Sequence, residues 1–322
     1  MPILLLSLPS DRLALVEPYR AELARLVPDM KVIITADKAE IERVLDDVEI
    51  IAGIVPAELL TRAKRLRWFH QWGAGADWLL NRPERLPTGV MLTNMSGLHA
   101  VQISEQIMSY ILAFARNLHR AIRAQQEHRW RPAEWDELFE LPGKTMLLLG
   151  LGGIGERTAQ VAAALGLHVM GVRNHPERSV PGVSHMYGPE SLPELWPVAD
   201  FVVLALPLTP MTRGLVGQNE LRTMKPSAYL INIGRGALVD EPALIVALQQ
   251  GWIAGAGLDV FAKEPLPADS LLWNMDNVII TAHYAGRSPH HEAGAMAILL
   301  DNLQRYSAHL PLRNVVDPQR GY

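Results

Sequence analysis

A single segment, residues 144–155, already indicates much of the architecture to be expected. It reads Lys-Thr-Met-Leu-Leu-Leu-Gly-Leu-Gly-Gly-Ile-Gly, and its apolar run at 146–149 predicts a buried parallel strand. An apolar helical pattern follows over residues 154–165. Three glycines separate strand from helix at the spacing G-x-G-x-x-G, namely Gly150, Gly152 and Gly155. They permit a tight turn, the close approach of a pyrophosphate, and close packing of a helix whose N-terminus faces the phosphates. We therefore interpret the segment as a dinucleotide-binding site.

Composition limits the class of protein. With 322 residues, 49% of them hydrophobic, the chain is long enough for two domains with separate cores. A net charge of -4 gives no indication of binding to nucleic acid or to a membrane surface, and no apolar run approaches the length of a membrane span. The absence of cysteine excludes disulfides and thiolate metal sites and fits a reducing cytosol. We expect a cytoplasmic protein without a metal site, because residues 290–292, His-His-Glu, have no second ligand cluster.

The first third of the chain alternates short apolar runs with amphipathic stretches. The apolar runs predict strands at residues 3–6, 31–35, 49–55, 67–71 and 90–93. The amphipathic stretches predict helices at residues 13–26, 39–45 and 57–63. This alternation predicts a parallel sheet with helices on both faces, in a flavodoxin-like domain.

A second series of strands and helices begins at the glycine segment. Its six expected strands are residues 146–149, 168–172, 201–205, 228–233, 253–258 and 278–281. One long helix over 98–127 is expected before it and another over 288–310 after it. The predicted fold is α/β, with two doubly wound parallel-sheet domains, Rossmann-like and flavodoxin-like, and a cleft between them. We expect residues 1–98 plus 287–322 to form the substrate domain and residues 99–286 the dinucleotide-binding Rossmann domain.

Polar residues suited to chemistry follow three of the last strands, where ligands bind in such sheets. Arg235 lies between two glycines, and its guanidinium fork could clamp a carboxylate; a surface arginine in a turn is the alternative. Asp259 and Glu264 follow the next strand, and His283 follows the last one. On position alone, Glu264 could be a solvated loop residue and His283 a structural hydrogen-bonding group.

Together these motifs resemble the D-isomer-specific 2-hydroxyacid dehydrogenase family, and its glyoxylate and hydroxypyruvate reductases in particular. The matching segments occur in the family's order and cover nearly the whole chain. They are residues 72–77, 150–155, 232–240, 258–261 with Glu264-Pro265, and 283–286.

The resemblance implies NAD(P)H-dependent reduction of a small 2-oxo acid to the D-2-hydroxy acid, with three catalytic residues. Arg235 would hold the substrate's carboxylate and carbonyl. His283 would give a proton to the carbonyl oxygen as hydride arrives from C4 of the nicotinamide, and Glu264 would favour the protonated His283. Histidine suits this role because it titrates near working pH and a nearby carboxylate favours its charged form.

The resemblance also implies binding residues. The substrate would be bound by Arg235, His283 and the loop Trp72, Gly73, Ala74 and Gly75, whose N–H groups at Ala74 and Gly75 would complete the carboxylate site; an ordinary turn is the alternative. The cofactor-binding residues would be Gly150, Gly152, Gly153, Ile154, Gly155, Arg173, Asn174, Leu206, Pro207, Thr212, Ile233, Gly234, Arg235, Asp259, His283, Ala285 and Gly286.

One departure from the family pattern bears on the cofactor. NAD-preferring members carry an acidic residue after the second strand of the cofactor domain, where this chain has Arg173 and Asn174. An arginine can bind a 2′-phosphate, so we expect NADP(H) to be preferred and NAD(H) to be possible. The alternative is a solvated Arg173 with no preference.

Two other functions remain open from the sequence, and so does one question about assembly. A formate or phosphite oxidiser of the same superfamily and a nicotinamide-sensing, corepressor-like binding protein are the alternatives; the set Arg235, Glu264 and His283 favours catalysis over sensing. We expect a homodimer formed through the cofactor domain, with a small 2-oxo or 2-hydroxy acid as the only other partner. Trp130 and Trp135 belong either to simple packing or to an arm that covers a neighbouring subunit's cleft.

Overall fold

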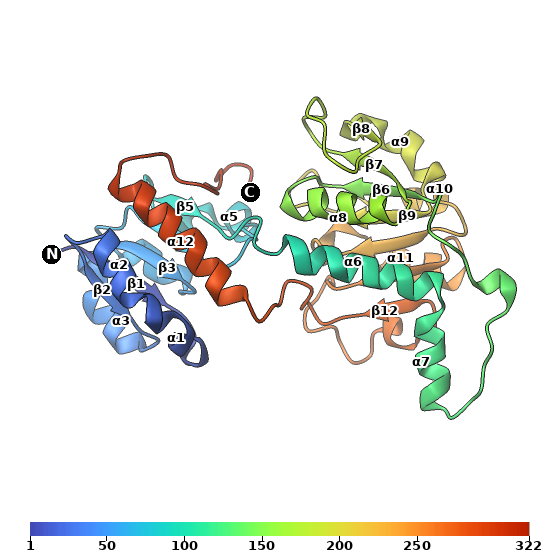
Figure 1. The fold of residues 1–322 in the computed structure, drawn as a ribbon, viewed down its shortest axis with the longest axis horizontal. Helices are drawn as coiled ribbons and strands as arrows, with labels where there is room; N and C mark the ends of the chain where they lie inside the picture. Colours follow the sequence, from blue (N-terminus) through green and yellow to red (C-terminus); the bar gives the residue numbers. More distant parts are fainter. Residues whose placement is uncertain (322) are drawn as a thin grey trace. The chain divides into compact units, whose positions relative to one another are not determined.

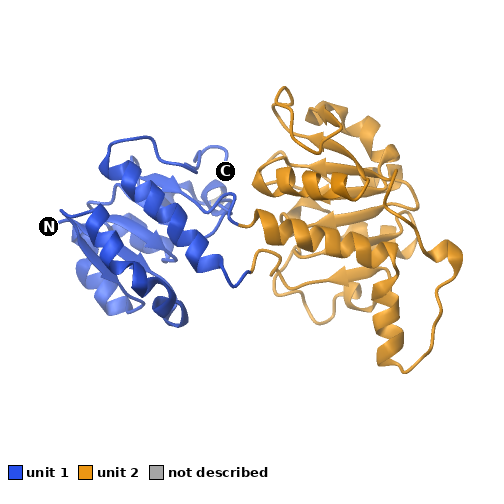
Figure 2. Cartoon of the chain, in the orientation of Figure 1, with its two compact units in different colours: residues 1–98, 288–322 blue, residues 99–287 orange. Residues whose placement is uncertain are grey.

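The computed structural model describes residues 1–321 and divides them into two compact units (Figures 1 and 2). The first consists of residues 1–98 and 288–322 and the second of residues 99–287. The chain therefore passes from one unit to the other twice, with the second passage one residue later than the 286/287 boundary expected from the sequence. Each unit is built on its own parallel sheet, and the two sheets have 5 and 7 strands, so the expected fold class is confirmed.

The first unit contains a sheet of strand order β2-β1-β3-β4-β5, with every pair parallel. Its strands are β1 (Ile3–Ser7), β2 (Lys31–Ile34), β3 (Val48–Gly53), β4 (Trp68–Gln71) and β5 (Met91–Thr93). Its helices are α1 (Ser10–Val16), α2 (Arg20–Leu26), α3 (Lys38–Val44), α4 (Ala57–Arg62), α5 (Trp78–Asn81) and α12 (His291–Ser307). This strand order is flavodoxin-like.

Both faces of this sheet are buried, which explains why its strands are continuous apolar runs rather than alternating ones. Side chains of β1 alternate between the faces: Ile3 and Leu5 join one apolar cluster, and Leu4 and Leu6 join the other. Helices α1, α2 and α12 cover the second face, and α12 packs along α1 and α2 although it is remote in sequence (Figure 1). The C-terminal segment thereby completes the unit that the N-terminal segment begins.

The second unit contains a sheet of order β12-β11-β10-β9-β6-β7-β8, again entirely parallel. Its strands are β6 (Thr145–Leu149), β7 (His168–Val172), β8 (His185–Tyr187), β9 (Phe201–Leu204), β10 (Tyr229–Asn232), β11 (Gly255–Leu258) and β12 (Val278–Ile280). Its helices are α6 (Ala100–Ala115), α7 (Leu118–Gln126), α8 (Gly153–Ala164), α9 (Leu192–Leu195), α10 (Gln218–Thr223) and α11 (Glu241–Gln249). Strand order reverses at β6, which pairs with β7 on one side and β9 on the other. The glycine segment follows β6 and therefore lies at the point where a dinucleotide binds in this class of sheet.

Two of the expected helices need correction, and one strand has to be added. The single helix expected over 98–127 is two helices, α6 and α7, because Asn117 adopts a left-handed conformation (φ 58) that ends the first and redirects the second (Figure 1). The helix expected over 13–26 is α1 and α2 joined by the 3-10 turn Glu17–Tyr19, which contains Pro18. A seventh strand, β8, was not expected.

Candidate functional site

The glycine segment after β6 has the geometry that a dinucleotide requires. Gly150 has φ +97, and a Cβ there would lie 2.5 Å from the Ala205 carbonyl oxygen. A Cβ on Gly155 would lie 2.0 Å from the Gly150 carbonyl oxygen, so only glycine lets α8 start this close to the strand. Gly152, in contrast, faces open space, with nothing within 4 Å of a Cβ. A phosphate could therefore approach the backbone at Gly152 in front of the N–H groups of the first turn of α8.

The other residues expected to bind the cofactor follow neighbouring strands of the same sheet. Arg173 directly follows β7, with its backbone N–H donating to the Tyr187 carbonyl (3.1 Å), and Asn174 beside it is exposed. The Arg173 side chain is half-buried, and its Nη1 is buried without a hydrogen-bond partner among residues 1–321. A buried guanidinium nitrogen without an acceptor is costly, so an anion supplied by a ligand would satisfy it.

Loops after β9, β10, β11 and β12 contain the rest of the expected cofactor-binding residues. Thr212 donates its hydroxyl to the Pro207 carbonyl (2.7 Å), which holds the loop after β9 together. After β10, a Cβ on Gly234 would lie 2.8 Å from the Leu206 carbonyl oxygen, so the loops after β9 and β10 approach closely. The remaining residues of this set are Ile233 and Arg235 after β10, Asp259 after β11, and His283, Ala285 and Gly286 after β12.

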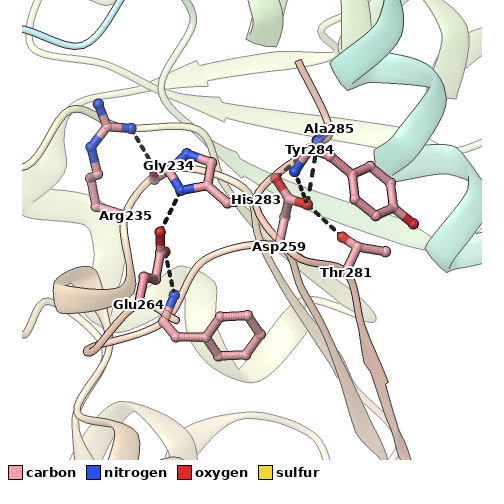
Figure 3. Close-up of polar contacts among 9 residues, drawn as sticks. Gly234, Arg235, Asp259, Glu264, Thr281, His283, Tyr284 and Ala285 are labelled. Atoms are coloured by element: carbon pink, nitrogen blue, oxygen red, sulfur yellow. Dashed lines mark hydrogen bonds and ion pairs between the residues drawn. The ribbon is translucent and has the colours of Figure 1, made fainter. Parts of the chain in front are cut away.

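His283 and Glu264 form a hydrogen-bonded pair at the end of the sheet (Figure 3). His283 Nδ1 lies 2.6 Å from Glu264 Oε2, and the other carboxylate oxygen accepts the Phe261 backbone N–H (3.0 Å). The His283 side chain is 51% exposed and that of Glu264 is 35% exposed. Glu264 therefore fixes the ring through Nδ1 and leaves Nε2 for another partner.

Arg235 lies in the loop after β10. This loop is at the same end of the sheet as the loops of Glu264 and His283, because β10, β11 and β12 are neighbours and parallel. Its Nη1 donates to the Gly234 carbonyl (2.8 Å), which holds the half-buried side chain near its own backbone (Figure 3). The three residues expected to be catalytic thus follow three adjacent strands.

Asp259 organises the loop of His283 from beneath. Its buried carboxylate accepts hydrogen bonds from the Thr281 hydroxyl (2.5 Å), from Tyr284 N–H (3.1 Å) and, through Oδ2, from Ala285 N–H (3.1 Å) (Figure 3). The Asp259 carbonyl accepts His283 N–H (2.9 Å). His283 itself has φ 51, an uncommon conformation for a residue with a side chain, and this set of bonds stabilises it.

The buried hydroxyl of Tyr110, in α6, hydrogen-bonds the Thr281 hydroxyl and so extends this network. Burial raises the pKa of Tyr110 to about 12, which keeps it a neutral hydrogen-bonding group. Sequence reasoning did not identify Tyr110 or Thr281. Their signal is a contact between residues 171 positions apart, which no local pattern contains.

In the first unit, the loop expected to bind a carboxylate follows β4. Trp72 is buried and donates its indole N–H to Glu292 (2.8 Å), whose other oxygen pairs with Arg12 (3.2 Å). Among residues 1–321, the backbone N–H groups of Ala74 and Gly75 have no hydrogen-bond acceptor. These donors are thus available to an anion.

The described part of the chain contains neither a cluster of metal ligands nor a membrane-spanning helix. Within residues 1–321 no group of three or more His, Asp or Glu side chains could hold a metal ion. Over the same range, no helix has the length and apolar character needed to cross a membrane.

Comparison with known proteins identifies the family. The model of the D-isomer specific 2-hydroxyacid dehydrogenase, NAD binding domain, matches residues 108–285. A glyoxylate reductase of Korarchaeum cryptofilum is 33% identical over 256 residues, which are 77% of this chain and 75% of that protein. A glyoxylate reductase of Aeropyrum pernix is 35% identical over 267 residues, 79% of this chain and 77% of that protein.

Solved structures agree. The NADPH-dependent glyoxylate/hydroxypyruvate reductase of Sinorhizobium meliloti, in complex with NADP and sulfate, is 29% identical, with a TM-score of 0.85 over 100% of both chains. A D-isomer specific 2-hydroxyacid dehydrogenase of Xanthobacter autotrophicus, in complex with NADPH and MES, is 31% identical, with a TM-score of 0.83 over 100% of both chains. The resemblance inferred from the sequence is confirmed: this chain belongs to the D-isomer-specific 2-hydroxyacid dehydrogenase family and is an NAD(P)-dependent enzyme.

Proposed function

We propose that the protein reduces a small 2-oxo acid of the glyoxylate or hydroxypyruvate type to the D-2-hydroxy acid, with NADPH as the preferred cofactor. The observation that carries the proposal is the His283–Glu264 pair, at 2.6 Å, in loops adjacent to that of Arg235. The similarity to glyoxylate reductases of Korarchaeum cryptofilum and Aeropyrum pernix, which are 33% and 35% identical to the chain, supports the substrate class.

His283 is the proton donor in this proposal. Because its Nδ1 faces Glu264, the proton that leaves is the one on Nε2, and it goes to the carbonyl oxygen of the substrate. Glu264 stabilises the imidazolium before transfer and holds the ring in place. The reduction forms a C–H bond at the former carbonyl carbon and an O–H bond at its oxygen. It leaves a neutral His283, which takes a new proton from solvent.

Arg235 binds the carboxylate of the substrate, since a guanidinium matches a carboxylate with two parallel, charge-assisted hydrogen bonds. The N–H groups of Ala74 and Gly75 provide further donors of the same kind. A carboxylate held by the two parallel hydrogen bonds of Arg235 cannot rotate, so the adjacent carbonyl has one orientation relative to His283.

The glycine segment, the N-terminus of α8 and the loops after β9, β10 and β12 would hold the dinucleotide. When bound, its nicotinamide supplies the hydride that reduces the carbonyl carbon. Asp259 keeps the His283 loop in its conformation through Tyr284 and Ala285.

The preference for NADPH rests on Arg173. An acidic side chain at this position would repel a 2′-phosphate; Arg173 instead offers a buried Nη1 that lacks an acceptor. The relatives of known structure that bound NADP or NADPH are consistent with this preference. Arg173 therefore contributes both a gained attraction and a lost repulsion.

We further propose a cytoplasmic homodimer formed through the second unit. Apolar side chains are exposed on α6 and α7 and in the segment that follows them, where the Trp130 and Trp135 side chains are 97% and 95% exposed. Side chains of this size exposed together favour a surface that a second copy covers. The exposed apolar residues of the two helices are Val101, Leu112, Leu118 and Ile122.

A panel assay tests the proposed function. Glyoxylate, hydroxypyruvate, pyruvate, 3-phosphohydroxypyruvate and an uncharged 2-oxo ester would each be supplied with NADPH and with NADH. We expect the highest kcat/KM with a small 2-oxo acid and NADPH, and a large loss with the ester. Equal rates with the acid and its ester would exclude the carboxylate-binding role of Arg235, and no rate with any 2-oxo acid would exclude the function.

A further inference from the structure

Three consecutive carbonyl groups of the loop after β4, those of residues 73–75, accept hydrogen bonds from donors of the first unit. The Gly73 carbonyl accepts Met95 N–H (3.1 Å) and Nε2 of Gln71 (3.3 Å), and the Gly75 carbonyl also accepts Nε2 of Gln71 (2.6 Å). The Ala74 carbonyl accepts Nδ2 of Asn94 (2.8 Å). Two side-chain amides thus hold three consecutive peptide groups, among them the two that carry the N–H groups of Ala74 and Gly75.

The orientation of both amides is determined by their second contacts. The indole N–H of Trp78 is only a donor, and it lies 2.6 Å from Oε1 of Gln71, so Nε2 must face the loop. The backbone N–H of Ser96 is likewise a donor, 3.0 Å from Oδ1 of Asn94, so Nδ2 must face Ala74. Neither amide can flip without placing two donors or two acceptors face to face.

Fixed carbonyls imply fixed N–H groups, because the C=O and N–H of a planar trans peptide point in opposite directions. The carbonyls of Gly73 and Ala74 belong to the peptides that carry the N–H groups of Ala74 and Gly75. Since both carbonyls bind inward to the unit, both N–H groups point away from those donors, and they have no acceptor within residues 1–321. The loop is therefore a pair of adjacent, oriented donors that exists before any ligand arrives.

We propose that Gln71 and Asn94 are positioning residues that preorganise this pair of N–H groups for a carboxylate. The inference deepens the proposed function and rests on it for the identity of the ligand as the carboxylate of a 2-oxo acid. An unheld loop could rotate its peptides and present carbonyl oxygens to the anion, which would repel it. The amides prevent this rotation, so the donors need no reorganisation on binding.

The test uses shape-matched replacements that remove the amides without adding charge. Gln71→Met and Asn94→Leu remove the donors, and Asn302→Leu is the matched control. Asn302 is also a fully buried amide of the first unit, and it bonds both the carbonyl (3.1 Å) and the N–H (2.8 Å) of Arg313, away from the loop. The variant Asn302→Leu therefore measures how oxalate binding changes when a buried amide that does not contact the loop is removed.

The readout is the Kd of oxalate, measured by isothermal titration calorimetry on the full-length protein saturated with NADPH, together with the Kd of NADPH. We expect Gln71→Met and Asn94→Leu each to raise the oxalate Kd about tenfold, the equivalent of one charge-assisted hydrogen bond. The NADPH Kd should change less than about twofold, and Asn302→Leu should leave the oxalate Kd near that of the wild type. With the preferred 2-oxo acid, KM should rise more than kcat falls.

Three results separate the possibilities. A wild type that reduces a 2-oxo acid, but whose oxalate affinity survives both replacements, overturns the inference and leaves the proposed function intact. A wild type that binds oxalate through Gln71 and Asn94 yet reduces no 2-oxo acid supports the inference and overturns the function. A wild type that binds no oxalate at all also overturns the inference. Should Gln71→Met fail to fold, Asn94→Leu carries the test alone, and unchanged oxalate affinity in that variant overturns the inference equally.

Discussion

Because His70 is buried, we expect the stability of the first unit to decrease in acid. It lies fully buried on β4, with Nδ1 2.5 Å from the Thr93 hydroxyl, which also accepts the indole N–H of Trp68 (2.8 Å). Nδ1 and the Thr93 hydroxyl share a hydrogen bond whose direction depends on the tautomer of the ring, and Nε2 has no partner among residues 1–321. Burial lowers the pKa of His70 to about 3, because the charged ring would lose its solvation.

The sign of the effect follows from the two end states. In the unfolded chain the histidine has its ordinary pKa of 6.5, so between pH 6.5 and about 3 the unfolded state binds a proton that the folded state does not. Burial of the neutral His70 thus costs no stability above pH 6.5, and the free energy of unfolding decreases as the pH falls below that value. At pH 5, about 1.5 units below 6.5, the loss is about 2 kcal/mol at about 1.36 kcal/mol per unit.

Urea unfolding at pH 7.5 and pH 5.0 measures this loss, with His70→Asn as the perturbation and circular dichroism as the signal. The asparagine can still accept from Thr93 but does not titrate. The free energy of unfolding of the wild type should fall between the two pH values by about 2 kcal/mol more than that of His70→Asn. His168→Asn, which replaces an exposed histidine, is the control. An equal decrease in wild type and His70→Asn would refute the reasoning.

Three further predictions concern the second unit. Tyr110→Phe removes the hydroxyl bonded to Thr281, so the free energy of unfolding in urea should fall by about 1 kcal/mol, and an unchanged value would contradict a role for this bond. Gly155→Ala places a Cβ 2.0 Å from the Gly150 carbonyl oxygen and should displace α8, raising the NADPH Kd in a fluorescence titration at least about tenfold; wild-type affinity would argue against phosphate binding there. Arg173→Ala should raise the KM for NADPH about ten- to a hundredfold and leave that for NADH nearly unchanged, whereas equal effects on both would exclude recognition of the 2′-phosphate.

The strands could largely be predicted from the sequence because they are buried on both faces. Residues 146–149, for example, are all buried, so no solvent-facing position interrupts their apolar pattern. The edge strand β8 has only three residues, His185–Tyr187, none of them fully buried, so it lacks that signal. The break between α6 and α7 lies at Asn117, which adopts a left-handed conformation. Neither Gly nor Pro occurs at this position, so the sequence gives no signal of the break.

Some residues of the candidate site could likewise be predicted from the sequence, and others could not. Arg235, Glu264 and His283 follow strands, and a parallel sheet places the ends of neighbouring strands together, so their proximity could be expected from topology. The residues that hold these three side chains, and those that hold the loop after β4, could not be predicted from topology. Asn94 and Tyr110 act through contacts with distant segments, and Gln71 acts through contacts within its own loop. A single sequence does not record which group each of these side chains faces.

The most direct test of the account is the turnover number of His283→Ala with the preferred 2-oxo acid and saturating NADPH. If His283 donates the proton, kcat should fall on the order of 10²–10⁴-fold, the usual contribution of a positioned acid, while the Kd of NADPH remains close to that of the wild type. Turnover near that of the wild type would contradict the account, because no proton donor would then be needed at the end of β12.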